Sequence, residues 1–107
     1  MDTKYDRQRR KQQAAVSVLC RDPSLLGDGR LRGRLQVIAG QVAGQAYRDS
    51  ISRWSELLSS GDVGAVSRAV LDDTATGAYL RNTSPLGVLL TPQEREDAIR
   101  GRMPAET

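Results

Sequence analysis

The chain has 107 residues, of which 38% are hydrophobic and 4% aromatic, with no Phe, no His and a single Cys. That length supports one domain with a modest aliphatic core, and the lack of His and of a second Cys argues against zinc sites, His-based proton transfer and an internal disulfide. Positive charge gathers in residues 1–53, with eleven Lys/Arg against five Asp, whereas residues 54–107 hold five Arg against eight acidic residues.

The first helix is predicted from Asp2 to about Cys20, and its start is strongly basic. Its candidate nucleic-acid contacts are Arg7, Arg9, Arg10 and Lys11. The Gln and Ala residues that follow favour helix, and Ala15, Val18 and Leu19 share one face. We therefore expect only the second half of this helix to dock, its first turns to fray, and Cys20 to be a small buried hydrophobe.

A single turn opened by Pro23 and a Gly-Asp-Gly joint at 27–29 precede the longest periodic stretch, residues 31–59. Its apolar residues recur at steps of four, three and four, first in Leu31, Leu35, Ile38 and Val42 and then in Tyr47, Ile51, Trp54 and Leu58. An offset of five between the two sets rotates the face, and Gly40 and Gly44 flank it. We predict one continuous but kinked helix, and the alternative is a break into two.

Cap signals predict three more helices. Asp62 caps a helix to about Leu71, and the run Asp72-Asp73-Thr74 caps a short helix to about Asn82. The inner side of that short helix is predicted to hold Ala75, Ala78 and Tyr79. The sequence Thr91-Pro92-Gln93-Glu94 is a capping box with Pro at the first helical position, and it opens a helix to about Arg100.

These elements predict an all-α fold, a small bundle of four to five helices around one long central helix. A short extended apolar segment is expected near residues 86–90 (LGVLL). Residues 1–101 form the single helical domain, and residues 102–107 are predicted to be a disordered tail.

Two groups of residues are candidates for contact with a protein partner. The first is Arg53, Trp54, Leu57 and Leu58, because Trp and Arg dominate interface hot spots. The alternative is that the only Trp nucleates the core. The second group is Arg81, Ser84, Pro85, Leu86 and Leu89. It belongs to a turn and an apolar strip that either form a partner groove or close the end of the bundle.

Residues 48–95 resemble the C-terminal region of actinobacterial helix-turn-helix antitoxin proteins. The shared features are an R-W-x-x-L-L segment, a Gly/Asp break, a valine-rich helix, an L-R-x-x-S-P turn and an L-T-P-x-E-R helix start. Here they fall on Arg53, Trp54, Leu57, Leu58, Leu80, Arg81, Ser84, Pro85, Leu90, Thr91, Pro92, Glu94 and Arg95. The resemblance implies a protein that binds and neutralises a cognate toxin, often a nucleotidyltransferase-like one, without catalytic residues. The DNA-binding domain that usually precedes this region is replaced here by the basic helix and the Leu31–Val42 stripe.

We therefore expect an antitoxin-like protein that acts by stoichiometric contact with a toxin and is not an enzyme, with no metal and no cofactor. Nucleotide-binding and nucleophile-elbow motifs are lacking, and no apolar run could span a membrane, which favours a cytoplasmic protein. One alternative is a small basic DNA-binding transcriptional regulator. Another is a structural homo-oligomer, such as a homodimer, with Leu31, Leu35, Ile38 and Val42 as its seam.

Overall fold

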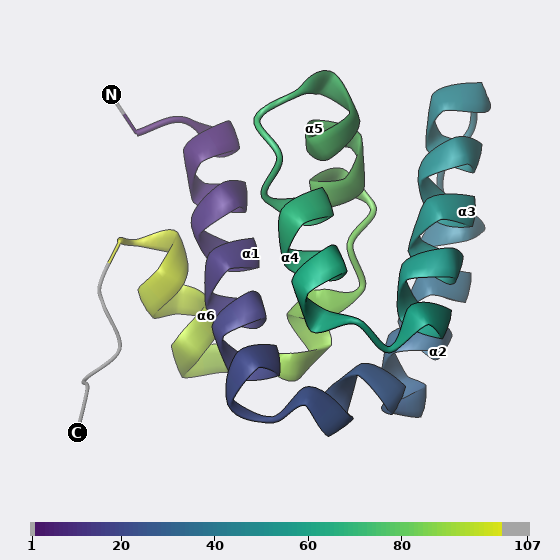
Figure 1. Ribbon diagram of the computed structural model, residues 1–107. Helices are drawn as coiled ribbons and strands as arrows, with labels where there is room; N and C mark the ends of the chain where they lie inside the picture. Colours follow the sequence, from purple (N-terminus) through teal and green to yellow (C-terminus); the bar gives the residue numbers. More distant parts are fainter. Residues whose placement is uncertain (1, 102–107) are drawn as a thin grey trace.

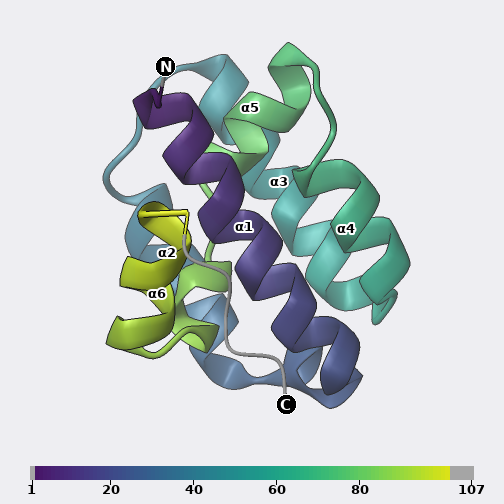
Figure 2. The same cartoon turned by 90° about the vertical axis from the view of Figure 1, so that its left-hand side faces the viewer.

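The computed structural model describes residues 2–101, and this part of the chain contains helices and no strands (Figure 1). Its elements are α1 (Lys4–Arg21), η1 (Pro23–Gly27), α2 (Gly29–Ala39), α3 (Gln45–Ser60), α4 (Val63–Val70), α5 (Ala75–Asn82), η2 (Leu86–Leu89) and α6 (Pro92–Ile99), where η marks a 3₁₀ helix. In Figure 1, α1 and α6 lie on one side, α2 and α3 on the other, and α4 and α5 between them, and Figure 2 shows α6 alongside α1. The predicted all-α class is confirmed, whereas residues 102–107 lie outside the described residues.

The predicted long central helix is wrong, because the chain breaks between α2 and α3. Helix α2 ends at Ala39, and α3 starts at Gln45 and folds back beside α2 (Figure 1). Gly44 has φ of +103°, a conformation that side-chain-bearing residues rarely adopt. A glycine at this point therefore lets the chain reverse direction, and the periodic stretch supplies two helices instead of one.

Helix α1 is anchored along its whole length, so the prediction that only its second half docks is wrong. Thr3 and Asp6 form a capping box at its start, in the turns that we expected to fray. Gln8 Nε2 donates to the Arg81 carbonyl at 3.1 Å, and the Ser84 hydroxyl donates to Gln12 Oε1 at 2.6 Å. Cys20, expected to be buried, is exposed.

The predicted caps are confirmed at three helix starts. The Asp62 carboxylate accepts from the Ala65 amide, the Thr74 hydroxyl accepts from the Gly77 amide, and Thr91 forms the capping box. The inner side of α5 differs from the prediction, since Gly77, Leu80 and Arg81 are the buried residues and Tyr79 is 37% exposed.

Residues 86–90 were predicted to be extended, and this is wrong, because they begin with the 3₁₀ helix η2. The turn before η2 fixes its start. The Leu86 amide donates to the Ser84 hydroxyl at 3.1 Å, and the Val88 amide donates to the Pro85 carbonyl at 3.3 Å. Coiling the segment turns both Leu86 and Leu89 into the core.

The core is aliphatic and surrounds Trp54, which has no exposed surface and donates through Nε1 to the Leu80 carbonyl at 2.8 Å. It also includes Leu31 and Leu35 of α2, and Ile38 is buried as well. Leu31, Leu35 and Ile38 are therefore buried within their own chain, and Val42, the fourth residue of the predicted homodimer seam, is half-buried between α2 and α3. No described helix combines the length and the apolar character needed to cross a membrane.

Candidate functional site

Most residues predicted to contact a partner lie in the core, which corrects their assignment as surface contacts. The buried members of the two groups are Trp54, Leu57, Leu58, Arg81, Pro85, Leu86 and Leu89. Their burial follows from the packing of α3, α5 and η2 around one aliphatic centre. Only Arg53 is exposed, where it pairs with Glu56 at 3.2 Å, and Ser84 is half-buried.

Arg81 is the one charged side chain in that buried set, at 2% exposed. Its Nη1 donates to the Val70 carbonyl at 3.0 Å and to the Asp72 carbonyl at 2.8 Å. Its Nη2 donates to the Tyr5 hydroxyl, and its guanidinium carbon lies 4.9 Å from the centre of the Tyr5 ring. Arg81 therefore ties the α4–α5 connection to α1 and has a structural role.

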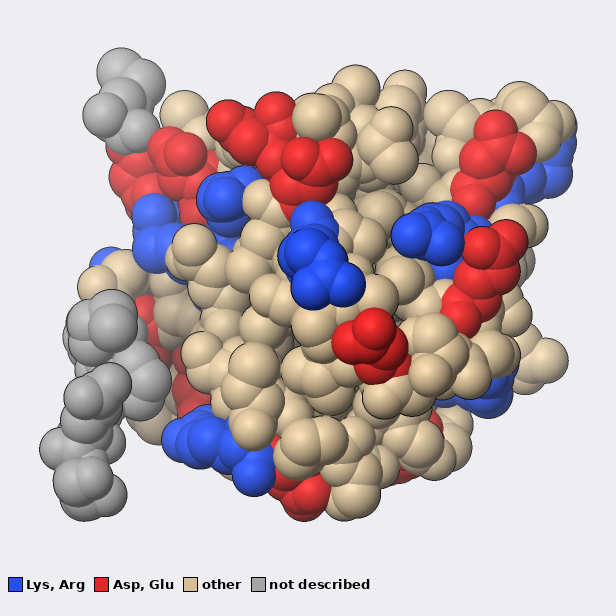
Figure 3. All heavy atoms as spheres, viewed as in Figure 1, with Lys and Arg blue, Asp and Glu red and all other residues tan. Residues whose placement is uncertain are grey.

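The four basic residues predicted to bind nucleic acid differ in their surroundings. Arg10 donates to the Ala98 and Ile99 carbonyls at the end of α6, where the helix dipole favours a cation. It also pairs with Asp2 at 2.8 Å, and its hydrogen bond lowers the pKa of that carboxyl. Arg7 is exposed, whereas Arg9 and Lys11 are half-buried. On the face in Figure 3, basic and acidic side chains alternate without a continuous basic stripe.

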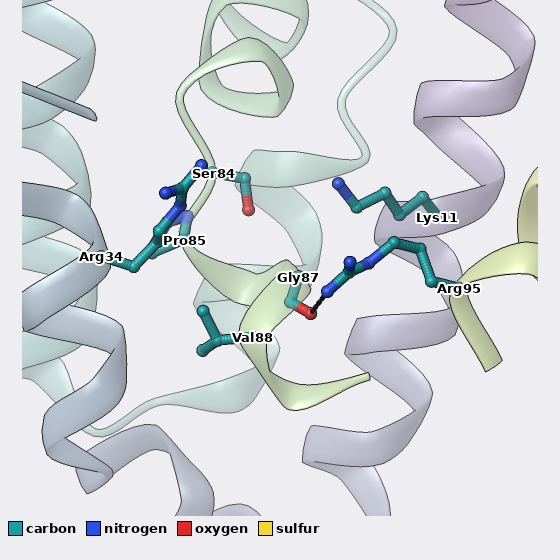
Figure 4. Close-up of a pocket in the computed structure, with 7 residues that line it drawn as sticks. All are labelled: Lys11, Arg34, Ser84, Pro85, Gly87, Val88 and Arg95. Atoms are coloured by element: carbon teal, nitrogen blue, oxygen red, sulfur yellow. Dashed lines mark hydrogen bonds between the residues drawn. The ribbon is translucent and has the colours of Figure 1, made fainter. Parts of the chain in front are cut away.

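Lys11 belongs instead to a hollow of about 380 Å³ where α1, α2, α6 and η2 meet (Figure 4). Three helices each contribute one cation to its walls, namely Lys11 from α1, Arg34 from α2 and Arg95 from α6. The other residues that line it are Ser84, Pro85, Gly87 and Val88. We call this hollow the cationic cleft.

The cations approach the cleft from different sides. In Figure 4, Lys11 extends from α1 towards Ser84, and Arg34 reaches in from the opposite wall. Arg95 is held in place by a hydrogen bond from its Nη2 to the Gly87 carbonyl at 3.1 Å. Gly87 also makes room for the lysine, because a Cβ there would lie only 3.0 Å from Lys11 Cε and 3.3 Å from Nζ.

The cleft concentrates positive charge without a counter-ion. Burial lowers the pKa of Lys11, and the charges of Arg95 and Arg34 lower it further. Within residues 2–101 no salt bridge involves Lys11, Arg34 or Arg95, and no carboxylate lines the cleft. A ligand carrying negative charge would relieve this repulsion, so the arrangement is suited to binding an anion.

The sequence predicted that Lys11 could contact phosphates, with Arg34 among the basic residues that could line up beside it, but it did not connect Arg95 with them. The three positions are far apart in the chain, and no local spacing connects them. The only hint was a glycine at position 87 inside an apolar strip, because a glycine there can mark a close approach of another side chain. Within the described part of the chain, no group of three or more His, Cys, Asp or Glu side chains could hold a metal ion.

Replacing Lys11 with methionine should raise the free energy of unfolding by roughly 0.5–1 kcal/mol, because it removes an uncompensated, desolvated charge and keeps the apolar stem. Because the pKa of Lys11 is lowered in the folded state, the free energy of unfolding of the wild type should increase as the pH rises through that lowered pKa, which lies below the ordinary value of 10.5. In the Lys11→Met protein this gain should vanish. Urea unfolding at neutral and alkaline pH tests both effects. The exposed Lys4→Met serves as control, and equal behaviour of the two variants would contradict the prediction.

Comparisons with known proteins identify no relative of this chain. No family model, no curated protein and no solved structure matches the chain. The antitoxin resemblance of residues 48–95 therefore remains a prediction, and the inference of function starts from the cationic cleft.

Proposed function

We propose that this protein acts by binding, and that the cationic cleft takes an acidic segment of a protein partner. The observation that supports the proposal is the convergence of Lys11, Arg34 and Arg95 from three helices. None of these three cations forms a salt bridge with a carboxylate among residues 2–101. Charge complementarity of this kind steers association and selects partners. The resemblance of residues 48–95 to antitoxins suggests a toxin as that partner, in the cytoplasm.

The shape of the cleft favours an acidic peptide segment over duplex DNA. A DNA duplex presents its phosphates on a broad surface and is held by basic side chains spread along the groove edges. Here the cations line a hollow, and Arg10, the best placed of the other predicted contacts, is engaged with α6. A single extended segment can enter such a hollow, and the half-buried Val88 offers apolar contact to its side chains.

In this proposal, part of the segment that resembles the antitoxin region forms one wall of the cleft. Pro85 lies in its wall, and Leu86 begins η2, which carries Gly87 and Val88. Ser84 links this wall to α1 through Gln12. The turn and the apolar strip therefore position Lys11 and Arg95, and the buried Trp54 holds α3 against α5.

A labelled peptide of six glutamates should bind the protein, and its affinity should fall as salt rises towards and beyond about 0.15 M, because screening then acts over roughly 8 Å. Arg34→Glu should weaken binding at least tenfold, since it places in the cleft a negative charge that repels the glutamates of the peptide. Arg48→Glu, an exposed position on α3 with the same change in net charge, is the control and should leave the cleft intact. Fluorescence anisotropy measures all three.

Two results would contradict the proposal. One is equal weakening by Arg34→Glu and Arg48→Glu, which would show that net charge alone attracts the peptide. The other is tight binding of a random 20-base-pair DNA duplex without peptide binding, which would favour the DNA-binding regulator instead. If the peptide binds as expected, co-expression with the product of the adjacent gene and co-elution in size-exclusion chromatography would test the toxin itself.

A further inference from the structure

We infer that the cationic cleft contains a phosphate site, which binds a phosphate dianion either free or as a monoester with a small apolar group. This inference goes beyond the proposed function: it rests on the same three cations, but it names a small ligand that can be tested without any protein partner. The relevant features are the number of free donors, their directions, the apolar side chain beside them and the way the site is held in place.

The charge of the cleft matches a dianion better than a single carboxylate. A phosphate monoester carries about −1.5 to −2 at pH 7, whereas a carboxylate carries one negative charge. Lys11, Arg34 and Arg95 together supply three positive charges, and no acidic residue lines the cleft to offset them. One carboxylate would therefore leave most of the repulsion in place, and a phosphate would remove most of it.

The donors also suit a tetrahedral group. The Lys11 ammonium has three N–H donors, and the guanidiniums of Arg34 and Arg95 have five each. Neither Lys11 nor Arg34 has a hydrogen-bond or ion-pair partner within residues 2–101, and Arg95 uses one donor on the Gly87 carbonyl. Lys11 and Arg34 reach in from opposite walls (Figure 4), so a ligand with oxygens in several directions could engage both.

An apolar side chain lies next to the cations. Val88 is half-buried and lines the hollow, whereas Pro85 lines it but is buried. The volume of the hollow, about 380 Å³, exceeds what an inorganic phosphate would fill. The remaining space therefore suits an organic group attached to the phosphate. A phosphate monoester should then bind more tightly than inorganic phosphate, because burial of apolar surface adds to the charge interaction.

Part of the site is held in place before a ligand enters. The Lys11 side chain lies over Gly87, where a Cβ would come within 3.0 Å of Cε, and Arg95 is fixed to the same residue. Helices α1 and α2 both pack against η2, which forms the wall between them. Arg34 is exposed and has no hydrogen-bond partner among residues 2–101, so a ligand would order this side chain at a cost in conformational entropy.

Isothermal titration calorimetry with inorganic phosphate at constant ionic strength tests the inference. Phosphate should bind the full chain, acetate should bind at least tenfold more weakly, and phenyl phosphate should bind several-fold more tightly than phosphate. Arg34→Gln should weaken phosphate binding at least tenfold, and the exposed Arg48→Gln should bind as the wild type does. Phosphate should also protect the Lys11 amine from acetylation by acetic anhydride, and peptide mapping locates that protection without any variant.

The inference is overturned if acetate binds as well as phosphate, if Arg34→Gln binds phosphate like the wild type, or if phosphate leaves Lys11 acetylation unchanged. Equal affinity for phosphate and phenyl phosphate would show that the apolar side of the hollow contributes nothing, and would overturn the expected preference for a monoester. Phosphate binding without hexaglutamate binding would contradict the proposed function and support the phosphate site. Hexaglutamate binding without phosphate binding would support the proposed function and contradict the phosphate site.

Discussion

Replacing Trp54 with alanine is expected to lower the free energy of unfolding by about 4 kcal/mol, the range measured for large aromatic residues in packed cores. Trp54 has no exposed surface, and its indole N–H donates to the Leu80 carbonyl at 2.8 Å. The substitution leaves a cavity at the centre of an aliphatic core and removes that hydrogen bond. Because small domains are stable by only about 5–15 kcal/mol, the variant should be partly unfolded at moderate temperature.

Urea unfolding followed by far-ultraviolet circular dichroism measures the loss, since the variant has no Trp to report by fluorescence. Trp54→Phe is the matched control. It keeps an aromatic ring in the core but removes the pyrrole part of the indole together with its N–H, so about 1–2 kcal/mol should be lost. If Trp54→Ala kept its stability and lost only the capacity to bind hexaglutamate, Trp54 would be a contact residue after all.

Gly77→Ala should lower the free energy of unfolding by about 3 kcal/mol, although alanine is the better helix former. A Cβ at position 77 would lie 2.0 Å from the Asp72 carbonyl oxygen and 2.8 Å from its carbon, both backbone atoms that no rotamer change can move. The start of α5 would have to shift. The Asp72 carbonyl also accepts from Arg81, so the shift would loosen the contact of α5 with α1 as well.

Gly33→Ala is the control for that substitution. Gly33 lies within α2, is exposed, and a Cβ there would meet nothing within 4 Å. Alanine at this site should therefore raise stability by roughly 0.5–1 kcal/mol, through helix propensity alone. Opposite signs for the two Gly→Ala substitutions in thermal and urea unfolding would support the close approach at Gly77. A gain in both would show that the α4–α5 connection has room to move.

Elements that depend on neighbouring residues could be predicted from the sequence. Thr91 and Glu94 cap α6 as expected because the bonds of a capping box join residues three positions apart. The turn at Pro23 and the start of α4 at Asp62 follow for the same reason. Periodicity was less informative, since the Leu31–Leu58 pattern fits one helix as well as two, and only the backbone at Gly44 separates these possibilities.

The all-α class and the location of the helix caps were thus determined by the sequence itself, because hydrophobic period and capping chemistry act over a few residues. Tertiary structure alone decided the site. It turned Trp54 and Arg81 inward, engaged Arg10 with the end of α6, and brought Lys11, Arg34 and Arg95 together around η2. Such contacts depend on how helices far apart in the chain pack, and the distribution of charged residues along the sequence contains no information about that packing.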